Sequence, residues 1–233
     1  MFERLRGTWT KAIEPLVLKM GNLDPGVLTW SSLVIAIGSF WLICGAGLDG
    51  DGAVMIGAAV LMIMLAGVLD ALDGALARHQ GIAGPYGDFL DHTIDRVVDV
   101  GLLIAIGMNS AFVSDPSSGA VAAVLTLFGS YMGTQAQSVG LDRIYGGFGR
   151  ADRMVLTVVC LFAAAWQAHS GGLGIDLSNA GYPSWLVLGN SHLNGMTAAL
   201  AISAWGGRSE EHTAELQSLV SLVCRLLLGK KKH

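Results

Sequence analysis

Charged residues and cysteines are both scarce in this sequence. Only 14% of its 233 residues are charged, whereas 52% are hydrophobic and the mean hydropathy is +0.56. Such an apolar chain is not typical of a soluble domain and indicates a membrane protein. Its three cysteines, Cys44, Cys160 and Cys224, stand singly, so the sequence contains no paired-cysteine metal motif and we interpret all three as packing residues. The net charge is −4, and we expect no nucleic-acid partner.

We also expect no secretory signal peptide, no internal repeats and no second domain. The first twenty residues interleave charged and apolar residues and lack a continuous apolar stretch. They predict an amphipathic interfacial helix over residues 1–22, or alternatively a helix packed on the rest of the protein. We expect one membrane domain over 1–205. The tail, 206–233, changes composition abruptly, which raises the alternative that it is not native coding sequence.

Long apolar segments fill the rest of the sequence. A helix that crosses a bilayer needs roughly 20 mostly apolar residues. Six segments are candidates, and the last of them contains Asn190, Ser191, His192 and Asn194, which either face the protein interior or precede the true start of the helix. The six segments are Val27–Leu48, Ala53–Leu69, Val97–Phe112, Ala120–Ala136, Met154–Ala168 and Trp185–Trp205.

The basic residues give the expected orientation. With the amino terminus inside, all 14 Lys and Arg residues fall in inner segments, and the outer loops Asp49–Gly52, Ser114–Gly119 and Ser170–Pro183 contain none. Cytoplasmic loops carry such an excess of basic residues. The prediction is an all-α integral protein of the cell membrane, with six spans and both termini in the cytoplasm.

Acidic residues are concentrated between the second and third segments, and four of them form two pairs. Asp70 and Asp73 are three residues apart, and Asp91 and Asp95 are four apart, so each pair projects from one face of a helix. The linker between them, 79–86, contains Gly81, Gly84 and Pro85 and predicts a reversal into an antiparallel helix.

The four carboxylates are therefore expected to converge and to repel one another unless cations hold them together. Oxygen ligands of this kind suit Mg²⁺, Mn²⁺ or Ca²⁺, and Mg²⁺ commonly joins carboxylates to substrate phosphates. The pattern indicates a metal site for a phosphorylated substrate. For any single Asp, an ordinary charge at the membrane boundary is the simpler interpretation, but not for all four together.

These residues carry a resemblance to a known family. The pattern Asp70-x2-Asp73-Gly74-x2-Ala77-Arg78-x8-Gly87-x3-Asp91-x3-Asp95 matches the CDP-alcohol phosphotransferase signature at every defined position. The resemblance covers about 25–153. It implies an enzyme of phospholipid biosynthesis that transfers a phosphatidyl-type group from a CDP-lipid to an acceptor alcohol and releases CMP, with its active site facing the cytoplasm.

The resemblance also implies residue roles. Asp70, Asp73, Asp91 and Asp95 would hold one or two Mg²⁺ or Mn²⁺ ions on the CDP pyrophosphate, and Asp95 would be the general base. The expected nucleotide site comprises Gly74, Ala77, Arg78 with phosphate, Gly87 where the next helix approaches, and Thr29, although Gly26 replaces the Asn that is more usual before this Thr.

The acceptor is less defined by sequence. The first half resembles archaeal and actinobacterial enzymes that join inositol phosphate to a CDP-lipid, but Gly133 and Gln135 stand where those relatives carry Lys and Arg. Arg150 and Arg153 remain candidates for binding the acceptor, with positive-inside anchoring as the alternative. Inositol phosphate or another polyol phosphate is the favoured acceptor, and serine, glycerol or inositol are alternatives.

Two further predictions concern the whole protein. A cation-coupled transporter is the competing class, since carboxylates inside membranes also mark ion pathways, but transporters usually place them at the midplane in repeated halves. Small-residue spacing in the spans, together with the family resemblance, favours a homodimer.

Overall fold

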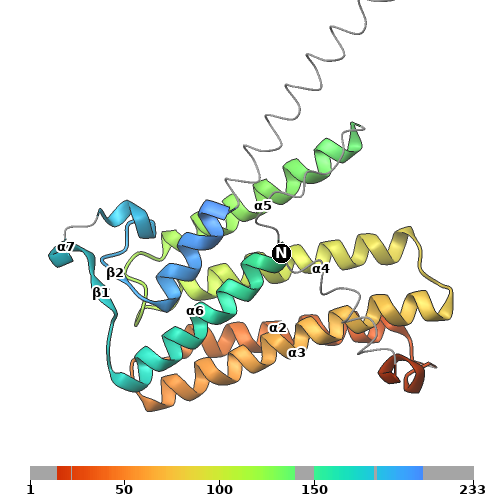
Figure 1. Cartoon of the computed structure of the whole chain (residues 1–233), viewed down its shortest axis with the longest axis horizontal. Coiled ribbons are helices and arrows are strands. Elements are labelled where there is room, and N and C mark those ends of the chain that lie inside the picture. Colours follow the sequence, from red (N-terminus) through yellow and green to blue (C-terminus); the bar gives the residue numbers. More distant parts are fainter. Residues whose placement is uncertain (1–14, 22, 140–149, 181–182, 207–233) are drawn as a thin grey trace, which may run out of the picture.

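The computed structural model describes residues 15–21, 23–139, 150–180 and 183–206. Within these ranges, long helices running alongside one another form most of the molecule (Figure 1). Each of the first five predicted apolar segments coincides largely with one helix, and α3 and α4 extend well beyond theirs to carry the acidic residues. The helices are α2 Pro25–Gly45, α3 Gly50–Gln80, α4 Pro85–Gly107, α5 Ser117–Ser138 and α6 Arg150–Ser170.

The helix ends follow from local sequence. The side chains of Asp24 and Asp49 accept hydrogen bonds of 2.8 and 2.7 Å from backbone N–H groups in the first turns of α2 and α3. Helix α3 ends where Gly81 takes a left-handed conformation (φ 72°), which glycine adopts without steric cost. Pro85 then opens α4 with a φ already suited to a first helical turn. The predicted reversal over 79–86 is confirmed.

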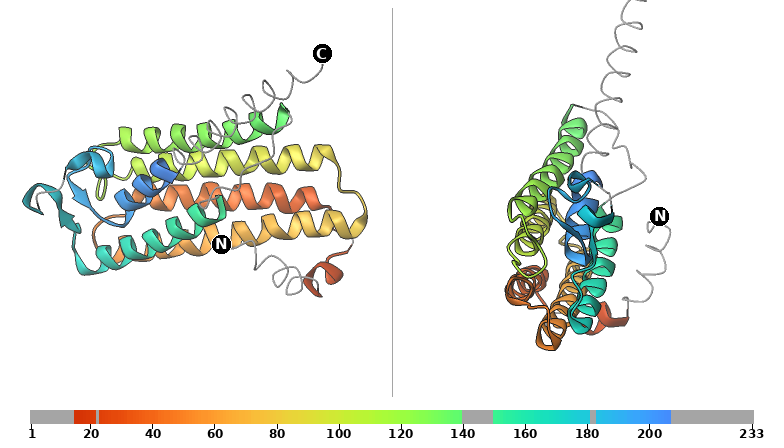
Figure 2. Two further views of the ribbon diagram at one scale, coloured as in Figure 1. Left: turned by 45° about the horizontal axis from the view of Figure 1, so that its top comes forward. Right: turned by 90° about the vertical axis from the view of Figure 1, so that its left-hand side faces the viewer.

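The helices pack so that α2 contacts both acidic helices and α6 lies against α3. Helix α2 contacts α3 and α4, α3 also contacts α6, and α4 contacts α5 (Figure 2). The main buried cluster includes Ile43, Ile56, Ile106, Leu161 and Leu200, which come from five different helices. The helix that contains Leu200 is therefore part of the same bundle.

One contact between α4 and α5 requires two glycines. A Cβ added to Gly107 would lie 2.6 Å from the Cα of Gly119, and one added to Gly119 would lie 2.7 Å from the Cα of Gly107. Packed carbon atoms do not approach so closely. The two helix backbones are therefore in direct contact at this end of the bundle, the end opposite the α3–α4 turn.

Short irregular elements close that end of the bundle (Figure 1). Strand β1, Ile175–Asp176, pairs antiparallel with β2, His192–Leu193, and the short helices α7, Leu177–Ala180, and η2, Ser184–Val187, lie between them in the chain. The sequence analysis predicted an outer loop over Ser170–Pro183, which contains β1 and α7, and placed β2 in the sixth apolar segment. It did not predict the strands, because two-residue strands are too short to produce a periodic pattern.

The predicted start of the sixth segment, at residue 185, is wrong. The last helix begins at 195, and its described part runs to 206. Asn190 and Asn194 precede it and are buried, with exposed fractions of 0% and 2%. The Asn190 Oδ1 accepts hydrogen bonds from the backbone N–H groups of Ser114 and Asp115, and the Asn194 amide donates to the Phe112 carbonyl. The alternative that these polar residues precede the true start of the helix is therefore correct for Asn190 and Asn194.

Only the end of the predicted interfacial helix lies within the described residues. Residues 15–19 are helical, and Val17 is buried against Leu28, Leu72 and Leu76 of α2 and α3. This contact supports packing on the bundle for the described part. Residues 1–14, the basic residue Arg143 and the tail from 207 lie outside the described ranges.

The outer surfaces of the helices are strongly apolar. Trp41, Val34, Leu61 and Trp166 have exposed fractions between 66% and 82%. Among the described helices, α2 and α3 are each long and apolar enough to cross a membrane. Large exposed apolar surfaces are unfavourable in water and are stable against lipid. The protein is thus mostly helical, with the surface of a membrane protein.

Candidate active site

The acidic residues converge near the α3–α4 turn. Asp70 and Asp73 lie in the last third of α3, and Asp91 lies in the second turn of α4. One carboxylate oxygen from each of these three residues lies within 4.8 Å of the other two. Asp73 is buried, whereas Asp70 and Asp91 are half-buried. Three carboxylates at this separation repel one another, and a divalent cation would relieve that repulsion.

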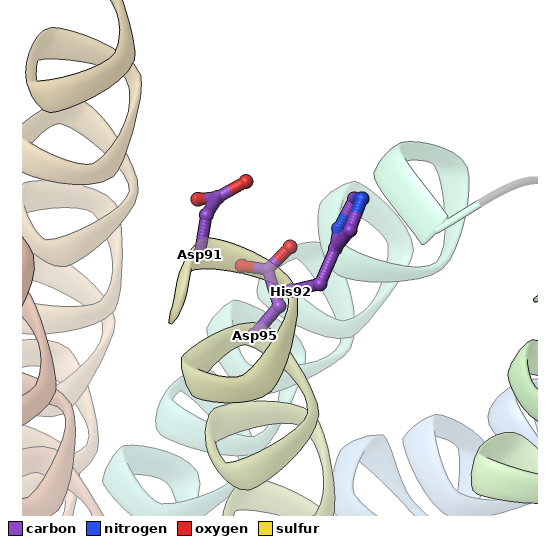
Figure 3. A group of neighbouring side chains, drawn as sticks. All are labelled: Asp91, His92 and Asp95. Carbon is purple, nitrogen blue, oxygen red and sulfur yellow. The ribbon is translucent and has the colours of Figure 1, made fainter. Parts of the chain in front are cut away.

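A second group lies on α4 itself. Ligand atoms of Asp91, His92 and Asp95 are all within 4.8 Å of one another. Figure 3 shows the carboxylates of Asp91 and Asp95 on the same side of the helix, with the imidazole of His92 leaving it in another direction. Asp95 is buried and His92 is exposed. Asp91 belongs to both groups and therefore connects them.

Helix α2 contributes a hydroxyl to the first group. The Thr29 Oγ1 donates to the Asp73 Oδ2 at 2.5 Å, and the Pro25 carbonyl lies 3.2 Å from the same hydroxyl. Both Thr29 and Asp73 are buried, with exposed fractions of 6% and 5%. The hydrogen bond fixes the orientation of the Asp73 carboxylate, since one of its oxygens is held from the α2 side.

The remaining residues of the signature line the open side of α3 and α4. Arg78 is exposed and lies one turn beyond Gly74, where an added Cβ would be 3.3 Å from the Arg78 Nη1. Ala77 is half-buried beside it. A Cβ added to Gly87 would meet no atom within 4 Å, so no approach of a neighbouring helix requires glycine at that position. The open space at Gly87 is available to a ligand.

Arg150, the first residue of α6, is paired with two carboxylates of α4. Its Nη2 lies 2.7 Å from the Asp95 Oδ1, and its Nε donates to both oxygens of Asp99, at 3.2 and 3.3 Å. The Arg96 Nη1 lies 3.6 Å from the Asp99 Oδ2. Helix α6 thus brings a cation directly to the predicted general base.

A cavity opens beside this ion pair, between α2, α3, α4 and α6. Its cavity volume is about 190 Å³. Asp70, Asp95 and Arg150 supply its charged lining, whereas most of the remaining wall is apolar and includes Phe40 and Ile63. A site with charged groups on one side and apolar walls on the other matches the two halves of an amphipathic phosphate ester.

A smaller space lies on the other side of Arg150, with a cavity volume of about 20 Å³, which is room for about one water molecule. Asp99 and Arg153 contribute charges to it, and Arg153 is almost fully buried, with an exposed fraction of 4%. Three hydroxyl side chains also line it, from α5, α6 and the last helix: Thr126, Thr157 and Ser203. Gly133 and Gln135 do not line this space, and Gln135 is exposed.

Sequence reasoning identified the four acids but missed two of their neighbours. Asp99 follows Asp95 by four residues, the same spacing that separates Asp91 from Asp95, so helical periodicity alone places it on the same face. His92 had no such signal, because an adjacent residue on a helix points about 100° away and only its long side chain brings the imidazole near the acids.

Comparison with known proteins adds independent findings. The family model for CDP-alcohol phosphatidyltransferases matches residues 23–188. An archaetidylinositol phosphate synthase of Aeropyrum pernix is 31% identical over 179 residues, which cover 73% of this chain and 84% of that protein. A phosphatidylinositol phosphate synthase of Cutibacterium acnes is 28% identical over 170 residues, which cover 69% of this chain and 77% of that protein.

The fold has a counterpart among solved structures. The crystal structure of Mycobacterium tuberculosis phosphatidylinositol phosphate synthase with CDP-DAG bound aligns with a TM-score of 0.63 at 18% identity, covering 89% of this chain and 92% of that one. The same enzyme in complex with manganese and citrate aligns with a TM-score of 0.60 at 17% identity, covering 89% of this chain and 86% of that one. At such identities the similarity establishes the fold alone.

Proposed function

The chain belongs to the CDP-alcohol phosphatidyltransferase family, and from this membership we propose that it joins the lipid phosphate of a CDP-lipid to a small polyol phosphate. The acceptor oxygen attacks the phosphorus that carries the lipid. A new P–O bond forms, the bond from that phosphorus to the bridging oxygen breaks, and CMP leaves with the bridging oxygen. The cavity supports this assignment, because it joins a charged side to apolar walls.

The donor set fits the divalent metal that the family implies. Asp70, Asp73 and Asp91 offer three carboxylate oxygens within 4.8 Å of one another, and Asp95 joins through the second group. These four residues would hold Mg²⁺ or Mn²⁺, which prefer oxygen ligands. When bound, the metal would neutralise charge on the pyrophosphate and make its phosphorus more electrophilic. Thr29 keeps Asp73 oriented toward this site.

Asp95 is our candidate for the general base. It lines the larger cavity together with Asp70 and Arg150, so the reacting hydroxyl of an acceptor held at Arg150 has a carboxylate within reach where it enters that cavity. The proton of the acceptor hydroxyl passes to Asp95 as the new P–O bond forms. Because Arg150 contacts Asp95 through Oδ1, the orientation of this carboxylate is fixed before substrate binds.

The open side of α3 and α4 is our candidate nucleotide site. Arg78 is exposed next to Gly74 and is positioned to pair with a phosphate of the CDP group. The helix surface carries only small residues at Gly74, Ala77 and Gly87, so that the nucleotide can approach the backbone closely. The open space at Gly87 supports this role.

The smaller space behind Arg150 is our candidate for the acceptor, and it would have to widen to admit a polyol phosphate, because its cavity volume is about 20 Å³. Arg150 and Arg153 supply positive charge, and the hydroxyls of Thr126, Thr157 and Ser203 offer hydrogen-bond partners for a polyol. Relatives named as inositol phosphate lipid synthases support a phosphorylated polyol. The absence of basic residues at Gly133 and Gln135 keeps serine, glycerol or inositol as alternative acceptors. Family membership argues against a transporter.

We also propose that the protein has six spanning helices, that both termini and the active site face the cytoplasm of the cell membrane, and that it is a homodimer. The five long helices and the helix that begins at 195 supply the spans. Arg78 and Arg150 lie at the same end of the bundle as the acids, in agreement with a cytoplasmic location for that end.

The experiment that tests this function is a CMP-release assay. The purified protein in detergent is given a CDP-lipid, Mg²⁺ or Mn²⁺, and one acceptor at a time from a panel of phosphorylated and unphosphorylated alcohols. We expect release with a polyol phosphate and none from Asp95→Asn. If CMP is released only with an unphosphorylated alcohol, that alcohol would replace the polyol phosphate as the proposed acceptor. If no acceptor causes CMP release, the proposed activity would be overturned.

A further inference from the structure

Asp99 is a buried carboxylate that the proposed chemistry leaves without a role. It lies one helical turn after Asp95, and its side chain is only 6% exposed. Its described contacts are with cations: the Arg150 Nε reaches both oxygens, at 3.2 and 3.3 Å, and the Arg96 Nη1 lies 3.6 Å away. A buried carboxylate so paired is costly to desolvate, so its position calls for an explanation beyond the stability of the fold.

The contacts of Arg150 indicate what Asp99 does. Guanidinium is a planar and rigid group, so partners on two of its edges fix both its position and its rotation. Asp99 holds the Nε, whereas Asp95 faces Nη2 at 2.7 Å. Arg150 also opens α6, and a helix amino terminus disfavours a positive charge. Without Asp99, this side chain, one third of which is exposed, has reason to turn toward solvent.

The position of Arg150 matters to both spaces of the site. The same side chain lines the larger cavity with Asp70 and Asp95 and the smaller one with Arg153. It therefore forms part of the wall between the proposed donor and acceptor sites. With its Nε engaged by Asp99, Arg150 approaches Asp95 from one side through Nη2. Loss of Asp99 would leave that Nε without its carboxylate partner, so that Arg150 is held only through its Nη2 contact with Asp95.

We infer that Asp99 is a positioning residue: it holds Arg150 between the two spaces so that Arg150 binds the acceptor anion while an oxygen of Asp95 stays available for the acceptor proton. This inference rests on the proposed function. It assigns to Asp99 no contact with substrate and no proton transfer. Its effect on the reaction passes entirely through Arg150.

Kinetics with the acceptor test the role. We expect Asp99→Asn to raise the acceptor KM or lower kcat by about tenfold or more, because small misplacements of a positioning group have effects of this order. The KM for the CDP-lipid should change by less than about twofold, and Asp99→Glu should recover part of the loss. Asp88→Asn is the matched control, since it removes an exposed carboxylate from the same helix.

A double-mutant cycle separates positioning from a structural effect. If Asp99 acts through Arg150, adding Asp99→Asn to Arg150→Gln should change the rate by less than about twofold. A full additional loss in the double variant would overturn the inference. So would unchanged kinetics in Asp99→Asn, or a parallel loss of affinity for both substrates together with a lower melting temperature.

One measurement does not depend on the acceptor and distinguishes failure of this inference from failure of the proposed function. Phenylglyoxal modifies accessible arginines, and mass spectrometry gives the rate at Arg150. We expect a several-fold faster reaction of Arg150 in Asp99→Asn and an unchanged rate in Asp88→Asn. An unchanged rate in Asp99→Asn contradicts the inference even if no acceptor is found. A faster rate with no CMP release in the wild type rejects only the proposed function.

Discussion

Asp91 has a central place among the acidic side chains. Its carboxylate contributes to the group with Asp70 and Asp73 and to the group with His92 and Asp95. A residue shared by two candidate metal positions affects both when it is changed. The other acids each belong to one group.

Replacement of Asp91 by Asn should therefore weaken metal binding most. We expect Asp91→Asn to lower Mn²⁺ affinity, measured by calorimetry or electron paramagnetic resonance, by at least about tenfold, since it removes a charged oxygen ligand. His92→Asn should change affinity far less, because the imidazole is exposed and leaves α4 in another direction. A larger effect from His92→Asn than from Asp91→Asn would reverse this assignment.

Asp73 and Asp95 should respond differently to loss of charge. Asp73→Asn is expected to abolish both turnover and metal-dependent CDP-lipid binding, because Asp73 is held inside the first group by Thr29. Asp95→Asn should abolish turnover and leave part of the binding. The measurement is CDP-lipid binding with and without Mn²⁺. Equal loss of binding in both variants would argue against a separate base role for Asp95.

Contacts set by local spacing could be predicted from the sequence, whereas contacts set by helix packing could not. The spacing of Asp70, Asp73, Asp91 and Asp95 was sufficient to predict that they converge, because two helices and a glycine-rich turn leave little alternative. The pairing of Arg150 with Asp99 joins residues 51 positions apart and depends on how α6 packs, which local patterns do not encode.

At the scale of helices, the contact between Gly107 and Gly119 is the most demanding. Gly107→Ala should destabilise the protein by about 1–3 kcal/mol, because its Cβ would lie 2.6 Å from the Gly119 Cα and both backbones would have to move. Thermal unfolding in detergent measures the change. Gly57→Ala in α3 is the matched control: no atom lies within 4 Å of its added Cβ, and alanine favours helix by up to about 1 kcal/mol. Equal changes in stability from Gly107→Ala and Gly57→Ala would show that the close contact between the two helices is unimportant.

The last helix shows why a hydropathy pattern misplaces a helix start. Trp185 and the apolar residues after it continue the hydrophobic signal, but Asn190 and Asn194 bind backbone groups of the 108–116 loop. These tertiary hydrogen bonds satisfy buried amides in an irregular segment. The helix begins only after them, at 195.

At the scale of the whole molecule, the two ends of α3 test the orientation. In a background in which Cys44, Cys160 and Cys224 are replaced by Ser, we expect Asp51→Cys to react with an impermeant maleimide in intact cells. His79→Cys should react only after permeabilisation, because inner loops carry the basic residues. Both side chains are exposed at opposite ends of one helix. Labelling of both from the same side would mean that α3 does not cross the membrane.

Because Arg150 borders both spaces of the site, it offers a route for thermodynamic linkage between the two proposed substrates. If occupancy of one space shifts the guanidinium, it changes the affinity of the other, and by the reciprocity of coupled equilibria the effect is equal in both directions. A CDP-lipid bound alone would then leave Arg150 on Asp95 and Asp99, with its anion-binding position empty. Water, which lacks an anionic group for Arg150 to bind, would not be held beside the free oxygen of Asp95 and would be a poor substitute for the acceptor, so the activated lipid would be protected from futile hydrolysis.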